Sequence, residues 1–115
     1  MLPGTFDWPA QYAGDTAGAQ SFNISRNGIP INLTGAVVRM QVRECGRPIP
    51  VLDLASNDGV SIVITDAESG MFRVGYYRNP PAPGSYVYDL EVTFPDGSVK
   101  TYLRGSYTIA GEVTQ

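Results

Sequence analysis

Strict alternation over residues 85–94 constrains this chain more than any other feature of its sequence. If the stretch is extended, Asp89, Glu91 and Thr93 occupy one face, and the apolar or aromatic residues occupy the other, namely Tyr86, Tyr88, Leu90, Val92 and Phe94. A period of two is the signature of a β-strand that buries one face. At about 3.3 Å per residue such a strand is about 33 Å long, and we expect its apolar face to lie in the core of a β-sheet protein.

Turn signals separate further alternating stretches along the rest of the chain. Asn27-Gly28 and Asp96-Gly97 are favoured in tight hairpins, because glycine adopts positive φ without strain. Gly105 is expected to form a bulge or bend, after which the last strand resumes. About seven to nine strands, with turns about every ten residues, predict an all-β fold, specifically an antiparallel, immunoglobulin-like β-sandwich.

The chain divides into two regions that differ in residue composition and pattern. Residues 20–115 contain the alternating stretches and are expected to form the sandwich domain. Residues 1–19 are rich in small side chains, and Gly14 and Gly18 loosen their connection to the sandwich domain. This first region is expected to form either a flexible N-terminal arm or a first strand.

Three aromatic side chains, Phe6, Trp8 and Tyr12, lie in that N-terminal region. An aromatic ring buries about 150–250 Å² when it is covered, so leaving it in water is costly. The rings are expected either to pack on their own domain or to dock on a neighbouring subunit, and the loose connection favours docking. Exchange of the segment between identical chains is one form that such a homo-oligomer takes.

Composition excludes several classes of function. The formal net charge is −3 and the eight Lys and Arg residues are scattered, whereas a nucleic-acid binder needs a basic surface. Histidine is absent, which removes the commonest general base and metal ligand and excludes Ser-His-Asp and Cys-His catalysis. The one cysteine, Cys45, forms no intrachain disulfide and is expected to be a partly buried, inert thiol.

The sequence also carries no sign of membrane insertion or secretion. No apolar run approaches the roughly 20 residues of a membrane-spanning helix, and the N-terminus lacks a basic segment followed by an apolar core. We therefore expect a protein that is made in a reducing cytoplasm and binds neither membrane nor nucleic acid.

Two groups of oxygen-bearing side chains invite comparison with known kinds of site. Asp89 and Glu91 lie two apart on one strand and point the same way, as a glycosidase pair would, but a solvated strand face produces the same pattern more often. Residues 57–59 and 66–68 supply oxygen ligands of the kind that calcium prefers. They lack the spacing of an EF-hand loop, and turns use the same residue types. We expect no catalytic residue, no metal site and no cofactor.

Tyrosines provide the remaining candidates for recognition. By alternation, Tyr77 and Tyr102 fall on outward faces, whereas Tyr76, Tyr86 and Tyr88 fall inward. Outward tyrosines suit protein interfaces and sugar-binding platforms. The candidate interface residues are therefore Phe6, Trp8, Tyr12, Tyr77 and Tyr102. An alternative function is a carbohydrate-binding module or adhesin-like domain that uses Trp8, Tyr77 and Tyr102.

Short motifs succeed one another in a characteristic order along nearly the whole chain. They are Gly14-Asp15-Thr16, residues 27–36 (NGIPINLTGA), residues 39–43 (RMQVR), Gly70-Met71-Phe72, residues 83–90 (PGSYVYDL), Asp96-Gly97, and the closing Gly105, Tyr107, Ile109, Val113 and Thr114. Each motif taken alone is typical of turns or strands in many proteins, and it is their order along the chain that makes the resemblance specific. In this order they resemble the small β-sandwich domain of phage tail and baseplate proteins, and are similar to the N-terminal domain of the phage baseplate upper protein.

The resemblance implies a structural role rather than a catalytic one. It implies contacts with other virion proteins and a final location in the virion after synthesis in the cytoplasm of the bacterial host, and it carries over no catalytic residues. In baseplate proteins, long regions that carry receptor-binding proteins come after this domain. The sequence here stops at Gln115, so we expect a stand-alone tail, baseplate or other virion component.

Overall fold

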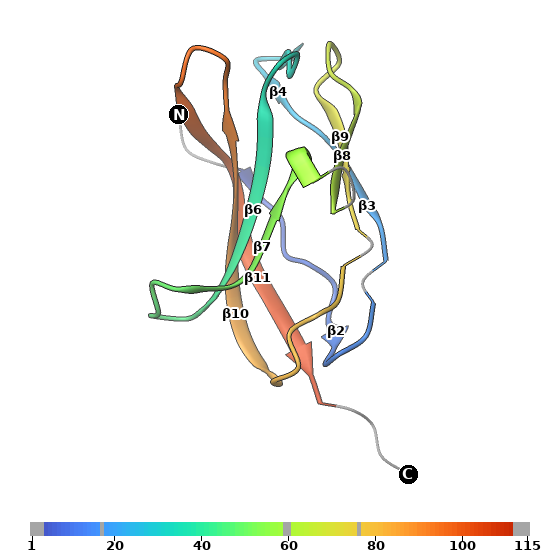
Figure 1. Ribbon diagram of the computed structural model, residues 1–115, viewed down its shortest axis with the longest axis vertical. Helices are drawn as coiled ribbons and strands as arrows, with labels where there is room; N and C mark the ends of the chain where they lie inside the picture. The colour runs from blue at the N-terminus through green and yellow to red at the C-terminus, as the bar shows by residue number, and fades with distance from the viewer. Residues whose placement is uncertain (1–3, 17, 59–60, 76, 112–115) are drawn as a thin grey trace.

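The computed structural model describes residues 4–16, 18–58, 61–75 and 77–111, and within them the chain is all-β (Figure 1). These ranges contain eleven strands, of which seven have four residues or more. The strands are β1 (Gly4–Thr5), β2 (Gln11–Tyr12), β3 (Gln20–Asn23), β4 (Ser25–Arg26), β5 (Ile29–Pro30), β6 (Val37–Glu44), β7 (Pro50–Ala55), β8 (Ile62–Asp66), β9 (Met71–Val74), β10 (Gly84–Thr93) and β11 (Val99–Ala110). The described helical structure is one 3-10 turn, η1 (Ser56–Asp58), and no described helix is long and apolar enough to cross a membrane. The prediction of an all-β fold is confirmed.

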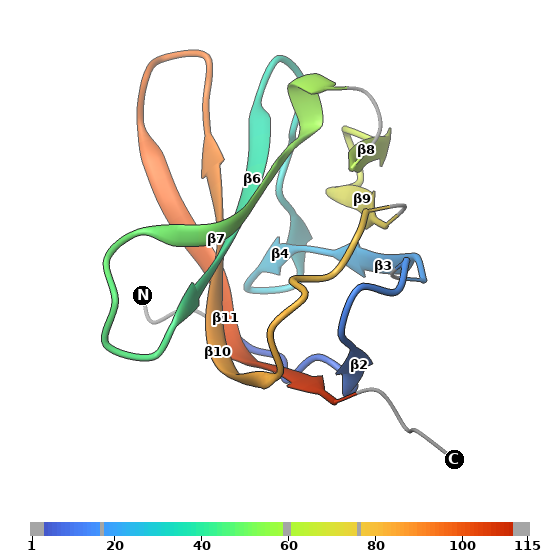
Figure 2. The same cartoon turned by 60° about the horizontal axis from the view of Figure 1, so that its bottom comes forward.

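The strands form one large sheet and two smaller ones. The large sheet has six strands in the order β1-β11-β10-β6-β7, and β2 also pairs with β11. Its central strands are antiparallel, whereas β1 and β2 run parallel to β11. The second sheet, β3-β9-β8, is antiparallel, and β4 and β5 form a separate hairpin. The three-stranded sheet lies beside one face of the large sheet (Figure 2).

Side chains from the facing sides of the two sheets form one core. The alternation predicted for residues 85–94 holds in β10, where Tyr86, Tyr88, Leu90 and Val92 lie in this core. Phe94, the fifth predicted residue, follows the end of β10 and is half-buried. The core also contains the inward residues of β6, β8 and β9, namely Val38, Met40, Val42, Ile62, Phe72 and Val74, and residues from other elements, among them Trp8, Leu54, Tyr107 and Ile109. The outer face of β10 and β6 carries Asp89, Glu91, Arg39 and Arg43 at alternate positions, in agreement with the predicted period of two.

Both predicted hairpin turns are present. Asn27 and Gly28 have φ values of 53° and 78°, and they connect β4 to β5 across the Arg26–Ile29 pair. Two successive positive φ values match the twist of the flanking strands, which is why Asn-Gly is favoured there. At the second turn, the Phe94 amide donates to the Ser98 carbonyl oxygen at 2.8 Å.

The bulge predicted at Gly105 lies elsewhere in the structure. β11 runs without a break through Gly105, which faces Tyr88 on β10. The irregularity falls where Leu90 and the next residue of β10 face Leu103 and Thr101, so that Tyr102 is the extra residue. The ring of Tyr102 packs edge-on against Phe94, with centroids 6.4 Å apart, and this contact accounts for its half-buried position.

Replacing Leu90 by alanine is expected to lower the free energy of unfolding by about 2–5 kcal/mol, because the fully buried side chain would leave a cavity. The matched control is Val87→Ala on the same strand, where the side chain is 43% exposed and the expected loss is below about 0.5 kcal/mol. Urea unfolding followed by tryptophan fluorescence measures both losses. Equal losses in the two variants would contradict the assigned facing of β10.

Candidate interaction site along the last strand

The N-terminal segment, which we define as residues 4–13, lies along β11 in parallel orientation (Figure 1). β1 and β2 each pair with β11. Between them, the amides of Phe6 and Trp8 donate to the carbonyl oxygens of Arg104 and Ser106, at 3.3 and 3.1 Å. Within the described residues, the N-terminal segment is therefore paired with the large sheet.

Trp8 enters the core between the two sheets. Its side chain is 4% exposed, and its ring centroid lies 5.7–6.0 Å from the rings of Phe6, Phe22, Tyr88 and Tyr107. These contacts are edge-on or tilted, which suits the quadrupoles of aromatic rings. In this structure Trp8 and Phe6 are covered by their own domain, and docking on a neighbouring subunit stays a prediction.

Gly105 allows the segment to come this close to β11. A Cβ atom at this position would lie 2.2 Å from the carbonyl oxygen of Phe6, which is far inside contact distance. The same oxygen accepts a hydrogen bond from the Tyr88 hydroxyl, and the amide of Ser106 donates to the carboxylate of Asp7 at 3.1 Å. We call the surface that receives the segment the β11 groove; it is formed by Gly105 and Ser106 of β11 and by the rings that contact Trp8, those of Phe22, Tyr88 and Tyr107.

A buried polar network fixes the far end of the segment. The hydroxyls of Tyr77 and Tyr107 lie 2.8 Å apart, and Tyr107 donates to the Asn79 side-chain oxygen. The side-chain nitrogen of Asn79 in turn donates to the Tyr12 carbonyl oxygen at 3.3 Å. Burial raises the pKa values of the Tyr77, Tyr88 and Tyr107 hydroxyls above their ordinary value, so all three stay protonated near neutral pH.

The outward facing predicted for Tyr77 is wrong, since its side chain is only 7% exposed. β9 ends at Val74 and Gly75 lies outside the strand, so a period of two does not set the facing beyond this point. Tyr76, for which the alternation predicts an inward facing, lies outside the described residues. Tyr12 remains 49% exposed.

The structure therefore divides the five candidate residues. Phe6 and Trp8 meet in the groove, and Tyr77 connects to Tyr12 through the polar network. Tyr102 contacts Phe94 instead. Sequence reasoning missed Gly105, Tyr88, Asn79 and Asp7 as parts of the site. Only Gly105 carried a signal, because a glycine inside a strand often marks a close backbone approach.

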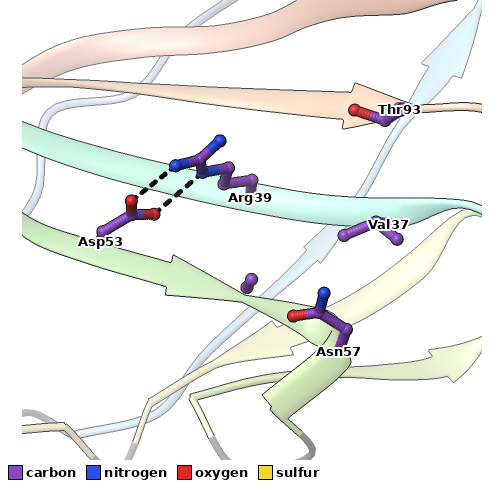
Figure 3. A pocket seen from close by; sticks show the side chains of 6 residues that line it. Val37, Arg39, Asp53, Asn57 and Thr93 are labelled. Atoms are coloured by element: carbon purple, nitrogen blue, oxygen red, sulfur yellow. Dashed lines mark hydrogen bonds and ion pairs between the residues drawn. The ribbon is translucent and has the colours of Figure 1, made fainter. Parts of the chain in front are cut away.

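The outer face of the large sheet contains a second candidate, an open cleft of about 580 Å³ between β6, β7 and β10 (Figure 3). Arg39 donates to both carboxylate oxygens of Asp53, at 2.9 and 2.6 Å. This bidentate pair lowers the pKa of Asp53 and raises that of Arg39, so neither group exchanges a proton near neutral pH. Asn57 and Thr93 line the rest of the cleft together with Val37 and Ala55.

The other polar groups singled out by the sequence are also distributed over the surface. Asp89 forms an ion pair with Arg43 at 3.3 Å on the same outer face. Among the described residues, no three His, Cys, Asp or Glu side chains gather into a possible metal site. The predicted partial burial of Cys45 is wrong, because it lies in the exposed turn after β6.

No model of a known protein family and no curated protein matches this sequence. The candidate sites are therefore assigned from their geometry alone.

Replacing Gly105 by alanine is expected to displace the N-terminal segment, because the added methyl group and the Phe6 carbonyl oxygen cannot occupy the same space. Trp8 then becomes exposed, and its fluorescence maximum moves to longer wavelength. Gly111→Ala is the matched control, since a Cβ atom there makes only an ordinary 3.7 Å contact with Pro83. An unchanged Trp8 spectrum in Gly105→Ala would disprove the tight approach.

Stability is expected to fall as the pH rises above about 10, where tyrosine ionises in the unfolded chain. The folded chain holds protons on Tyr77, Tyr88 and Tyr107 to higher pH because their pKa values are raised, so it binds more protons than the unfolded chain there. Tyr77→Phe removes one contribution and is expected to flatten the decline. Urea unfolding at several alkaline pH values measures it, and identical slopes for the two proteins would refute the assignment.

Proposed function

We propose that this chain is a non-enzymatic structural component of a phage particle, in the tail or baseplate, and acts through contacts with other virion proteins. The observation that supports this best is the docking of the N-terminal segment on β11, because adding a strand to a sheet edge is a common way for β-proteins to join one another. The proposal places the protein in the virion after synthesis in the bacterial cytoplasm.

We further propose that the sheets form an immunoglobulin-like sandwich. Support comes from the shared core of the large sheet and the β3-β9-β8 sheet, and from the antiparallel pairing of β6 with β10, two strands that are distant in the sequence.

The charged groups of the outer face support a non-enzymatic role. Arg39 with Asp53 and Arg43 with Asp89 are paired charges on an open sheet. A general acid or base works best when its pKa lies near the operating pH, and the lowered pKa of Asp53 takes it away from that range.

The carbohydrate-binding alternative receives less support from the same geometry. A sugar platform needs exposed rings, but Trp8 and Tyr77 are buried in their own core. Tyr102, which completes the predicted set, is half-buried against Phe94. The three rings therefore present no common surface.

The location in the particle is testable by sedimentation. Lysate of a phage-producing culture of the source bacterium is separated on a density gradient, and an antibody against the purified chain detects the protein. We expect it in the fractions that contain intact particles, together with the tail proteins after heads and tails are separated. A protein found only in the soluble fractions, with particles free of it, would refute the proposal.

A further inference from the structure

We propose that the β11 groove also accepts the N-terminal segment of a second copy of this chain, so that neighbouring copies join by exchanging residues 4–8. The inference depends on the proposed function for its setting, a particle in which many copies lie close together.

The groove is specific for one kind of occupant. It takes an extended strand in parallel orientation, since Phe6 and Trp8 donate in succession to carbonyl oxygens of β11. Aromatic side chains at alternate positions fill the core, and the carboxylate between them, Asp7, accepts from the Ser106 amide. Gly105 leaves room for the backbone of such a strand.

The same chain supplies that occupant. Trp8 is the only tryptophan in the sequence, so the Phe-Asp-Trp pattern of residues 6–8 occurs once in each copy. A vacant groove would expose the rings that surround Trp8, and a segment that leaves its groove would expose Trp8 itself. A second copy covers both the vacant groove and the displaced Trp8, because it has the same segment and the same groove.

A hinge separates the part that exchanges from the part that stays. In β1, Thr5 faces Arg104, and in β2, Gln11 faces Ile109. The segment thus advances by 11 − 5 = 6 residues while β11 advances by 109 − 104 = 5. The extra residue therefore lies in the exposed Pro9–Ala10 stretch. Pro9 has no amide hydrogen to donate to the sheet, and we call this stretch the hinge.

Beyond this hinge, the chain is fixed to its own domain. The Asn79 side chain donates to the Tyr12 carbonyl oxygen. The backbone amides of Ala13 and Gly14 donate to the carbonyl oxygens of Ala110 and Pro80, respectively. Residues 4–8 are therefore able to leave as a unit while β2 remains. Exchange recreates every contact of the closed form in the neighbour, so the two forms differ mainly in the hinge conformation and in the entropy of association. The high local concentration in an assembly offsets that entropy.

Cysteine pairing between two full-length variants tests the exchange. Both carry Cys45→Ser, which removes the only native thiol. One also carries Asp7→Cys and the other Ser106→Cys, at exposed positions that face each other in the parallel pairing, within the reach of a disulfide. The two proteins are mixed in mild urea, returned to buffer at high concentration and oxidised, and a mass tag on one chain identifies mixed dimers.

We expect at least about tenfold more mixed covalent dimer from this pair than from the control pair of Asp7→Cys with Ser98→Cys, because only the first pair meets in an exchanged groove. Ser98 is exposed in the hairpin that precedes β11, so it reports random collision. A chain with both Asp7→Cys and Ser106→Cys closes on itself at high dilution, which shows that the cysteines can react.

Two results would overturn the proposal. One is a yield of mixed dimer equal to that of the control pair, while the doubly substituted chain closes on itself in full. The other is failure of that chain to close, which would mean that the segment does not occupy the groove at all. The experiment uses purified protein only, so either result leaves the particle location untouched, and a failed sedimentation test leaves the exchange untouched.

Discussion

The insertion of Trp8 between the two sheets is the interaction on which the rest of this structure depends. Its ring contacts Phe22 from the small sheet and both Tyr88 and Tyr107 from the large one, so it links the layers directly. Covering an indole ring at about 25 cal/mol per Å² contributes about 4–6 kcal/mol, which is comparable to the whole stability of many small domains. Gly105 makes this insertion possible, because any larger residue would hold the backbone of the segment away from β11.

The two sides of the large sheet differ in how readily they pair with a further strand. At one edge, β7 begins with Pro50, has a register shift opposite β6, and carries the charge of Asp53 on its exposed face. These features discourage a further strand from pairing with an edge. At the other edge, β11 already accepts a strand in parallel orientation. Strand-to-strand joining is therefore favoured on the β11 side, and the ion pairs of the outer face, which contribute little to stability when exposed, keep that face hydrophilic.

The polar interior has a narrower role, which is to determine where the N-terminal segment ends its path. Tyr77, Tyr107 and Asn79 satisfy one another's hydrogen bonds and then the backbone of Tyr12. A buried polar group without a hydrogen-bond partner is costly. Because the network ends on the Tyr12 carbonyl oxygen, it restricts the position of β2 more strongly than apolar contacts would. The sequence could not reveal it, since its members come from three separate parts of the chain and no short-range pattern relates them.

The sequence by itself determined the strands and their hairpins, because alternation over residues 85–94 and the Asn27-Gly28 pair are local properties that act through the nearest neighbours in the chain. It also determined that the aromatic rings of the N-terminal segment need cover. Only the tertiary structure decided what covers Trp8, and that Gly105 serves a close approach rather than a bulge. The reason is physical: the groove is formed by side chains and backbone from both ends of the chain, so its shape exists only once those ends have come together.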